Sequence, residues 1–139
     1  MWRLATESEL KKWIERANNT YDRYIKTIDN CNDQIARLQP VYDDLTQIKK
    51  DFRTFQKDTA KIIEDQRFWT GEQFNLFCQK GESLDDACRQ YYLLLDQAHD
   101  AVNTKIGDLK AEKDRLVPLL GGLLGDIDKW WAELKNFTN

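Results

Sequence analysis

The spacing of apolar and tyrosine side chains constrains the fold of this chain more than any other feature. Over residues 10–45 these side chains recur at alternating steps of four and three, at Leu10, Ile14, Ala17, Tyr21, Tyr24, Ile28, Cys31, Ile35, Leu38, Tyr42 and Leu45. A mean repeat of 3.5 residues is typical of a helix that packs lengthwise against another helix, and it differs from the alternation of a strand. The spacing therefore predicts an all-α protein with coiled-coil-like packing.

The first helix is expected over about residues 7–66. Thr6 and Glu9 have the spacing of a capping box at its start. Pro40 predicts a kink inside one continuous helix, because the apolar spacing is present on both sides of it. After Leu45 the spacing takes one short step, which resembles a stammer, and resumes at Ile48, Phe52, Phe55, Thr59 and Ile62.

A second helix is expected over about residues 72–117, after a turn at 67–71. Its apolar spacing includes Phe74, Phe77, Gly81, Leu84, Cys88, Tyr91, Leu95, Ala98, Val102, Leu109 and Leu116. Two helices joined by so few residues form a long antiparallel hairpin. We expect Gly71 to permit the tight turn and Trp69 to cover the end of the helix pair.

The C-terminal segment is expected to form a short amphipathic helix of its own. Pro118, Gly121 and Gly122 predict an interruption, after which an apolar stripe returns over about residues 123–137. In an antiparallel hairpin this tail would reach the neighbourhood of Trp2 and Trp13. A turn centred near residue 68 would likewise place Cys31 opposite Ile106.

Composition argues against several classes of function. The net charge is −3, with 21 Lys and Arg against 24 Asp and Glu and no basic stripe, so we expect no nucleic-acid partner. No apolar run approaches the ~20 residues of a membrane span, and no signal peptide is recognisable at the N-terminus. The three cysteines are too far apart for an internal disulfide, and Cys31 and Cys88 are expected to be buried.

No motif indicates catalysis, a metal or a cofactor. Asp96 and His99 have a spacing seen in di-iron bundles, but His99 is the only histidine, so we expect it to be exposed and solvated. Phosphate-binding loops, nucleophile elbows and zinc-ligand spacings are not found in the sequence. We therefore interpret the protein as non-enzymatic.

Several apolar side chains fall on positions that flank the packed face of a two-helix hairpin. Because two helices cannot cover them, a protein partner or a second copy is expected to do so. The candidates for a partner interface are Trp13, Ile25, Phe77, Tyr92 and Leu94, with Val41, Ile63 and Leu119 on similar positions.

The sequence WTGEQF, between the two expected helices, carries a family resemblance. With Trp69, Gly71 and Phe74 it resembles the WxG family of small helical-hairpin proteins of bacterial type VII secretion, and most closely the Firmicutes branch that accompanies LXG toxins. The resemblance implies a targeting partner that binds the helical N-terminal domain of an exported toxin and engages the secretion machinery. It also implies a cytoplasmic protein that is exported, if it travels with its cargo, without a cleaved signal peptide.

Two alternatives stay open from the residues alone. The chain could instead be a self-associating helical hairpin, a homodimer with no toxin client. Tyr92 and Asp96 have the Tyr-x-x-x-Asp spacing of a family export signal, but they lie in mid-helix. The other interpretation of this pair is that Tyr92 packs on a neighbour and Asp96 is solvated.

Overall fold

Two long helices make up the described part of the protein. The computed structural model describes residues 5–65 and 72–138, in which α1 spans Glu7–Asp65 and α2 spans Glu72–Thr138. No strand occurs in these two ranges, so the described chain is all-α, as the apolar spacing predicts. The turn residues Trp69 and Gly71 lie outside the described ranges, and so does Trp2.

The start of α1 is capped by Thr6. The Thr6 hydroxyl accepts a hydrogen bond from the Glu9 amide at 3.1 Å, and the Thr6 carbonyl accepts one from the Leu10 amide at 3.0 Å. The hydroxyl thereby satisfies an amide that has no acceptor within the helix. This half of the predicted capping box is confirmed.

The C-terminal segment is not a separate helix, contrary to the prediction. α2 continues through Pro118, Gly121 and Gly122 to Thr138. With Gly125 included, a proline and three glycines inside a helix cost about 6 kcal/mol together. Burial of one large aliphatic side chain contributes about 1.5–3 kcal/mol. The helix therefore persists because three such side chains are buried on this stretch, Leu116, Ile127 and Leu134.

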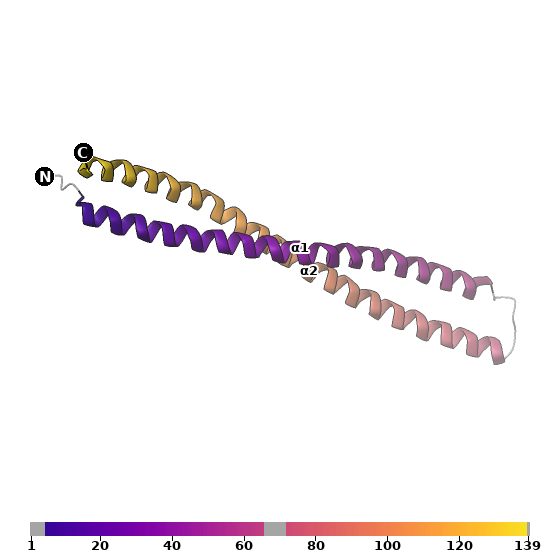
Figure 1. The fold of residues 1–139 in the computed structure, drawn as a ribbon. Helices are drawn as coiled ribbons and strands as arrows, with labels where there is room; N and C mark the ends of the chain where they lie inside the picture. The colour runs from indigo at the N-terminus through magenta and orange to yellow at the C-terminus, as the bar shows by residue number, and fades with distance from the viewer. Residues whose placement is uncertain (1–4, 66–71, 139) are drawn as a thin grey trace. The chain divides into compact units, whose positions relative to one another are not determined.

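The paired helices divide into two compact units. Unit 1 joins Met1–Ala36 to Ile106–Asn139, and unit 2 is Arg37–Lys105. Within each unit a segment of α1 runs alongside a segment of α2 in the opposite direction (Figure 1). α1 is continuous through Pro40, and the boundary on α1 follows Ala36, whose carbonyl has no amide partner at Pro40.

Unit 1 holds most of the apolar core. Leu10, Ile14 and Leu134 form a buried cluster, against which Trp130 packs. Among the described residues every buried hydrophobic side chain except Cys88 and Leu95 belongs to this unit. We call the residues of each helix that face the other helix the seam, and in unit 1 the seam follows the predicted spacing.

The seam of unit 2 differs from the prediction. The less exposed residues of α1 continue at steps of three and four without a stammer, at Tyr42, Leu45, Lys49, Phe52, Gln56 and Thr59. Ile48 and Phe55, which the short step placed in the seam, are exposed. The prediction followed apolar residues, whereas the helix keeps its geometric repeat and accepts Lys49 and Gln56 as polar members.

The same correction applies to α2. The expected seam residues Leu84 and Tyr91 are exposed, and Ala98 is exposed as well. Gly81, Cys88, Leu95 and Val102 face α1 as expected. The other four residues that face α1 in unit 2 lie one position after the expected ones, at Cys78, Asp85, Tyr92 and His99, so the regular repeat continues.

The pairing of the helices is also shifted from the expected one. A turn centred near residue 68 would pair Lys49 with Cys88, but Lys49 contacts Asp96, about two helical turns further along α2. Trp13 pairs with Trp130, with ring centroids 5.8 Å apart, so the C-terminal segment does reach Trp13. Cys31 and Cys88 are buried as predicted, and all three cysteines are free thiols.

Candidate partner-binding interface

A polar contact crosses the seam of unit 2. The Lys49 ammonium donates a hydrogen bond to Asp96 Oδ1, and only 18% of the Lys49 side chain is exposed. This hydrogen bond raises the pKa of Lys49 and lowers the pKa of Asp96, and both shifts favour the charged forms. The contact favours the observed alignment of α1 against α2 in this unit, because it gives the mostly buried Lys49 side chain a carboxylate partner.

Tyr92 occupies the seam beside this ion pair. The Arg53 guanidinium lies 5.0 Å from the centre of its ring, and the Lys49 ammonium lies 5.5 Å from it. Both cations therefore interact with the ring face of Tyr92. Tyr92 and Asp96, the export-signal candidate, both contact α1, Tyr92 from the seam and Asp96 from the flank beside it.

His99 is not exposed, contrary to the prediction. Only 16% of its side chain is accessible, its ring stacks on Tyr42 with centroids 4.4 Å apart, and Nε2 lies 2.9 Å from Thr46 Oγ1. The prediction failed because it treated position 98 as the seam residue. An open groove of about 270 Å³ lies here, and it is lined by Thr46, Lys49, Lys50, Arg53, Tyr92 and His99.

The other side of unit 2 is apolar. In an antiparallel helix pair the positions just before the seam residues share one flank, and those just after them share the other. Thr46, Arg53 and Asp96 lie on the second flank, which is polar. On the first flank, the residues with large apolar or small side chains are Val41, Ile48 and Phe55 of α1 with Leu84, Tyr91 and Ala98 of α2. Asp44, Asp51 and Asp58 lie further out on the same side of α1.

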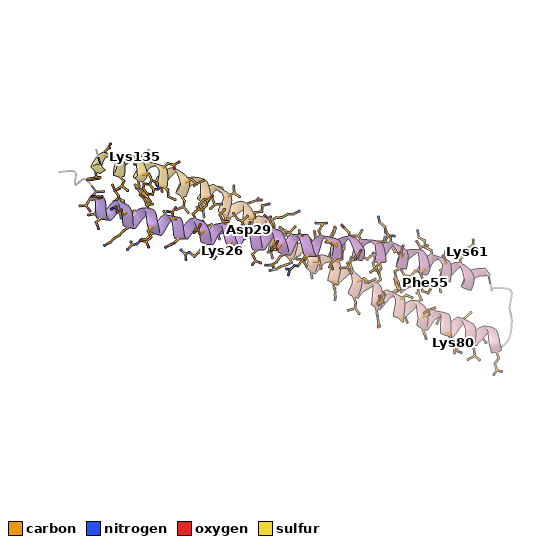
Figure 2. All side chains as sticks on the ribbon, in the orientation of Figure 1. Lys26, Asp29, Phe55, Lys61, Lys80 and Lys135 are labelled. Carbon is orange, nitrogen blue, oxygen red and sulfur yellow. The ribbon has the colours of Figure 1, made fainter. Side chains whose placement is uncertain are left out.

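Ring contacts show that the first flank is continuous across the two helices. Phe52 of the seam contacts Tyr91 on α2 at 4.9 Å and Phe55 on α1 at 6.0 Å between ring centroids. Phe55 and Tyr91 nevertheless remain 48% and 49% exposed. Figure 2 labels Phe55 in this part of α1.

α2 extends this flank outward with a second regular row. Between Lys80 and Lys105, the exposed residues of this row at steps of three and four carry only apolar or small side chains, at Leu84, Ala87, Tyr91, Leu94, Ala98 and Ala101. Such a row is the pattern that a helix presents to another helix. We define the apolar flank as these six residues of α2 with Val41, Ile48 and Phe55 of α1.

The expected interface residues are distributed over both units. Leu94 belongs to the apolar flank and is 62% exposed. Trp13 and Ile25 lie in unit 1, where Trp13 packs on Trp130 and Ile25 is half-buried. Tyr92 is a seam residue. Phe74 and Phe77 lie in α2, but their side chains are outside the described part of the structure.

Most of the apolar flank was missed by the sequence reasoning. Ile48, Phe55, Leu84 and Tyr91 had been assigned to the seam because they are apolar. The signal that could have found them is the unbroken repeat itself. Continued from Tyr42 through Lys49, the repeat places Ile48 and Phe55 on the flank.

The described residues offer no metal site and no membrane span. Within residues 5–65 and 72–138 no three His, Cys, Asp or Glu side chains gather as metal ligands. Neither described helix contains a stretch apolar enough to cross a bilayer. No protein-family model, curated protein or solved structure matches the chain.

Proposed function

We propose that this protein is a non-enzymatic partner protein of type VII secretion, which binds the helical N-terminal domain of an exported LXG toxin and aids its export. The observation that carries this proposal is the apolar flank of unit 2. The WTGEQF resemblance supplies the family, and the flank supplies a surface on which a client could dock.

The flank has the exposure and the residue pattern of a docking surface. Val41, Ile48 and Phe55 on α1 and Leu84, Tyr91 and Leu94 on α2 are each 42–62% exposed. Large contiguous apolar patches are rare on monomeric proteins and normally mark an interface. Because the α2 row repeats at steps of three and four, a helix packed lengthwise is the client element that fits it.

Co-expression tests this proposal directly. The chain is expressed with the neighbouring open reading frames, purified through a tag on the chain, and its complexes are sized by light scattering. We expect a stoichiometric complex with a toxin N-terminal domain. A tight homodimer that excludes every neighbouring product would contradict the proposal and favour a self-associating hairpin.

Substitutions on the flank separate docking from folding. Phe55→Ser with Tyr91→Ser should abolish the complex while the far-ultraviolet circular dichroism of the free chain is unchanged. The matched control is Val117→Ser with Trp131→Ser, two exposed residues of unit 1. Loss of the complex in the control alone would place the interface elsewhere. Trp69→Ala should reduce export of the client and leave the chain folded.

A further inference from the structure

A row of aspartates borders the apolar flank on α1. Asp44, Asp51 and Asp58 are exposed and seven residues apart, so they follow one line along the helix. Each lies three residues after an apolar flank residue, Val41, Ile48 or Phe55 in turn, and is therefore its neighbour on the helix surface. The acidic row and the apolar flank run side by side over the same stretch of α1.

The helix itself does little to neutralise this row. The positions three and four residues from the three aspartates carry one base, Lys61, which follows Asp58. Lys50 and Lys57 each precede an aspartate and so point about 100° away around the helix. Within the described residues no ion pair engages the row, and Asp51 accepts one hydrogen bond, at 2.9 Å from Gln47 Nε2.

The border on α2 has a different character. Beyond Ala87, Leu94 and Ala101 the next row around α2 is neutral and polar, with Ser83, Gln90, Gln97 and Thr104. The docking surface is therefore charged along the α1 border and neutral along the α2 border. This asymmetry specifies both the charge of an occupant and its rotation about its own axis.

We propose that the occupant of the apolar flank is a single amphipathic helix of another protein, with an apolar face and a row of Lys or Arg along the edge that meets Asp44, Asp51 and Asp58. The inference rests on the proposed function and names the chemistry of the client. Charge complementarity along such an edge selects the partner and its alignment more than it adds affinity.

Neither the apolar flank of a second copy nor its exposed apolar row on α2 provides that helix. Its own apolar flank carries the same aspartates, so two flanks in contact would bring together surfaces with no basic row. The exposed apolar residues of α2 in unit 1, Val117, Leu124 and Trp131, are accompanied by Asp114 and Asp128 on the neighbouring row. Neither surface supplies lysines or arginines at seven-residue spacing.

Two synthetic peptides and the full-length protein test the inference. Both peptides are helices of about 28 residues with the same Leu/Ile face, long enough to be helical on a template. One peptide has Lys along one edge and Gln along the other, and the second has Glu in place of Lys. Binding is measured by fluorescence anisotropy at about 50 mM and about 500 mM salt.

We expect the Lys peptide to bind about tenfold more tightly than the Glu peptide at the lower salt, because three exposed ion pairs contribute modestly. Higher salt should reduce the ratio. The variant Asp44→Lys/Asp51→Lys/Asp58→Lys should reverse the preference. The control variant Asp22→Lys/Asp29→Lys/Asp33→Lys changes the net charge by the same amount on exposed residues of unit 1, and it should still prefer the Lys peptide. Asp29 is labelled in Figure 2.

Several results would overturn the inference. Equal binding of the two peptides, no binding of either, or an equal response in both triple variants would each do so. Failure of the proposed function looks different. If no toxin domain co-purifies but the Lys peptide binds selectively, the function fails and the inference holds. If a client co-purifies and the aspartate variants bind it unchanged, the inference fails and the function holds.

Discussion

Thr46 Oγ1 on α1 lies 2.9 Å from His99 Nε2 on α2, and the same hydroxyl donates its hydrogen to the Tyr42 carbonyl at 2.9 Å. A hydroxyl has one hydrogen, so Thr46 can only accept from the imidazole. The neutral His99 ring therefore carries its hydrogen on Nε2. The free nitrogen, Nδ1, lies 4.0 Å from Asp100 Oδ1.

Nuclear magnetic resonance can test this tautomer. His99 is the only histidine, so its ring nitrogens can be assigned without ambiguity. At neutral pH we expect nitrogen shifts of the Nε2–H form, and Thr46→Val should weaken that preference. The Nδ1–H form in the unmodified protein would contradict the hydrogen-bond assignment.

The ion pair of Lys49 and Asp96 predicts a stability difference that depends on pH. The folded pKa of Asp96 is lowered by the Lys49 hydrogen bond, so its contribution is present above the ordinary value of about 3.9 and is lost as pH falls through the folded pKa. The pKa of Lys49 is raised, so its contribution is present below about 10.4 and is lost as pH rises through the folded pKa.

Asp96→Asn should therefore be less stable than the parent protein at pH 7. The gap should narrow as pH falls from about 4 towards the lower folded pKa of Asp96, because the unfolded chain takes up its proton first. Urea unfolding at several pH values measures the gap. Asp86→Asn removes an exposed carboxylate of the same helix and is the control. A gap of the same size at pH 3 and pH 7 would show that the charge of Asp96 does not matter.

Core and surface leucines of unit 1 should differ sharply in their effect on stability. Leu10 is fully buried in the cluster with Ile14 and Leu134, so Leu10→Ala should lower the free energy of unfolding by about 2–5 kcal/mol. Leu119 is 42% exposed, and Leu119→Ala should change it by less than about 0.5 kcal/mol. Equal effects in chemical unfolding would mean that Leu10 is not in a packed core.

The glycines of α2 predict a gain in stability. Apart from the adjoining backbone of its own helix, an added Cβ at Gly121 or Gly122 would have no heavy atom within 4 Å. Alanine lowers the backbone entropy of the unfolded chain, so each substitution should stabilise the protein by about 0.5–1 kcal/mol. A higher melting temperature in thermal unfolding would support a continuous helix here, whereas a lower one would indicate a non-helical backbone at these positions.

The fold was more predictable from sequence than the interface. Heptad spacing predicts both helices because burial of a regular row dominates helix packing, and Leu10, Ile14 and Cys31 lie where the spacing placed them. The pattern misleads where polar residues such as Lys49 occupy the seam. The apolar residues next to such a polar seam residue are then taken for seam residues. Residues of the apolar flank, such as Ile48 and Phe55, are therefore assigned to the seam.

The continuity of α2 was missed for a related reason. Pro118 and the adjacent glycines are strong local signals for a helix end. The free-energy cost of these residues in a helix can be estimated from the local sequence. The burial of Leu116, Ile127 and Leu134 depends instead on packing against α1, which the local sequence does not reveal. The shifted pairing of α1 and α2 could not be predicted either, because it depends on which polar groups meet across the seam.

The small number of buried side chains in unit 2 affects its local stability in solution. Cys88 and Leu95 are its only buried hydrophobic side chains among the described residues. This pair of helix segments therefore gains little stability from its own core. Its backbone amides should exchange with heavy water sooner than those around Leu10 and Leu134. A third helix bound to the apolar flank would slow that exchange, because the three helices would then share one core.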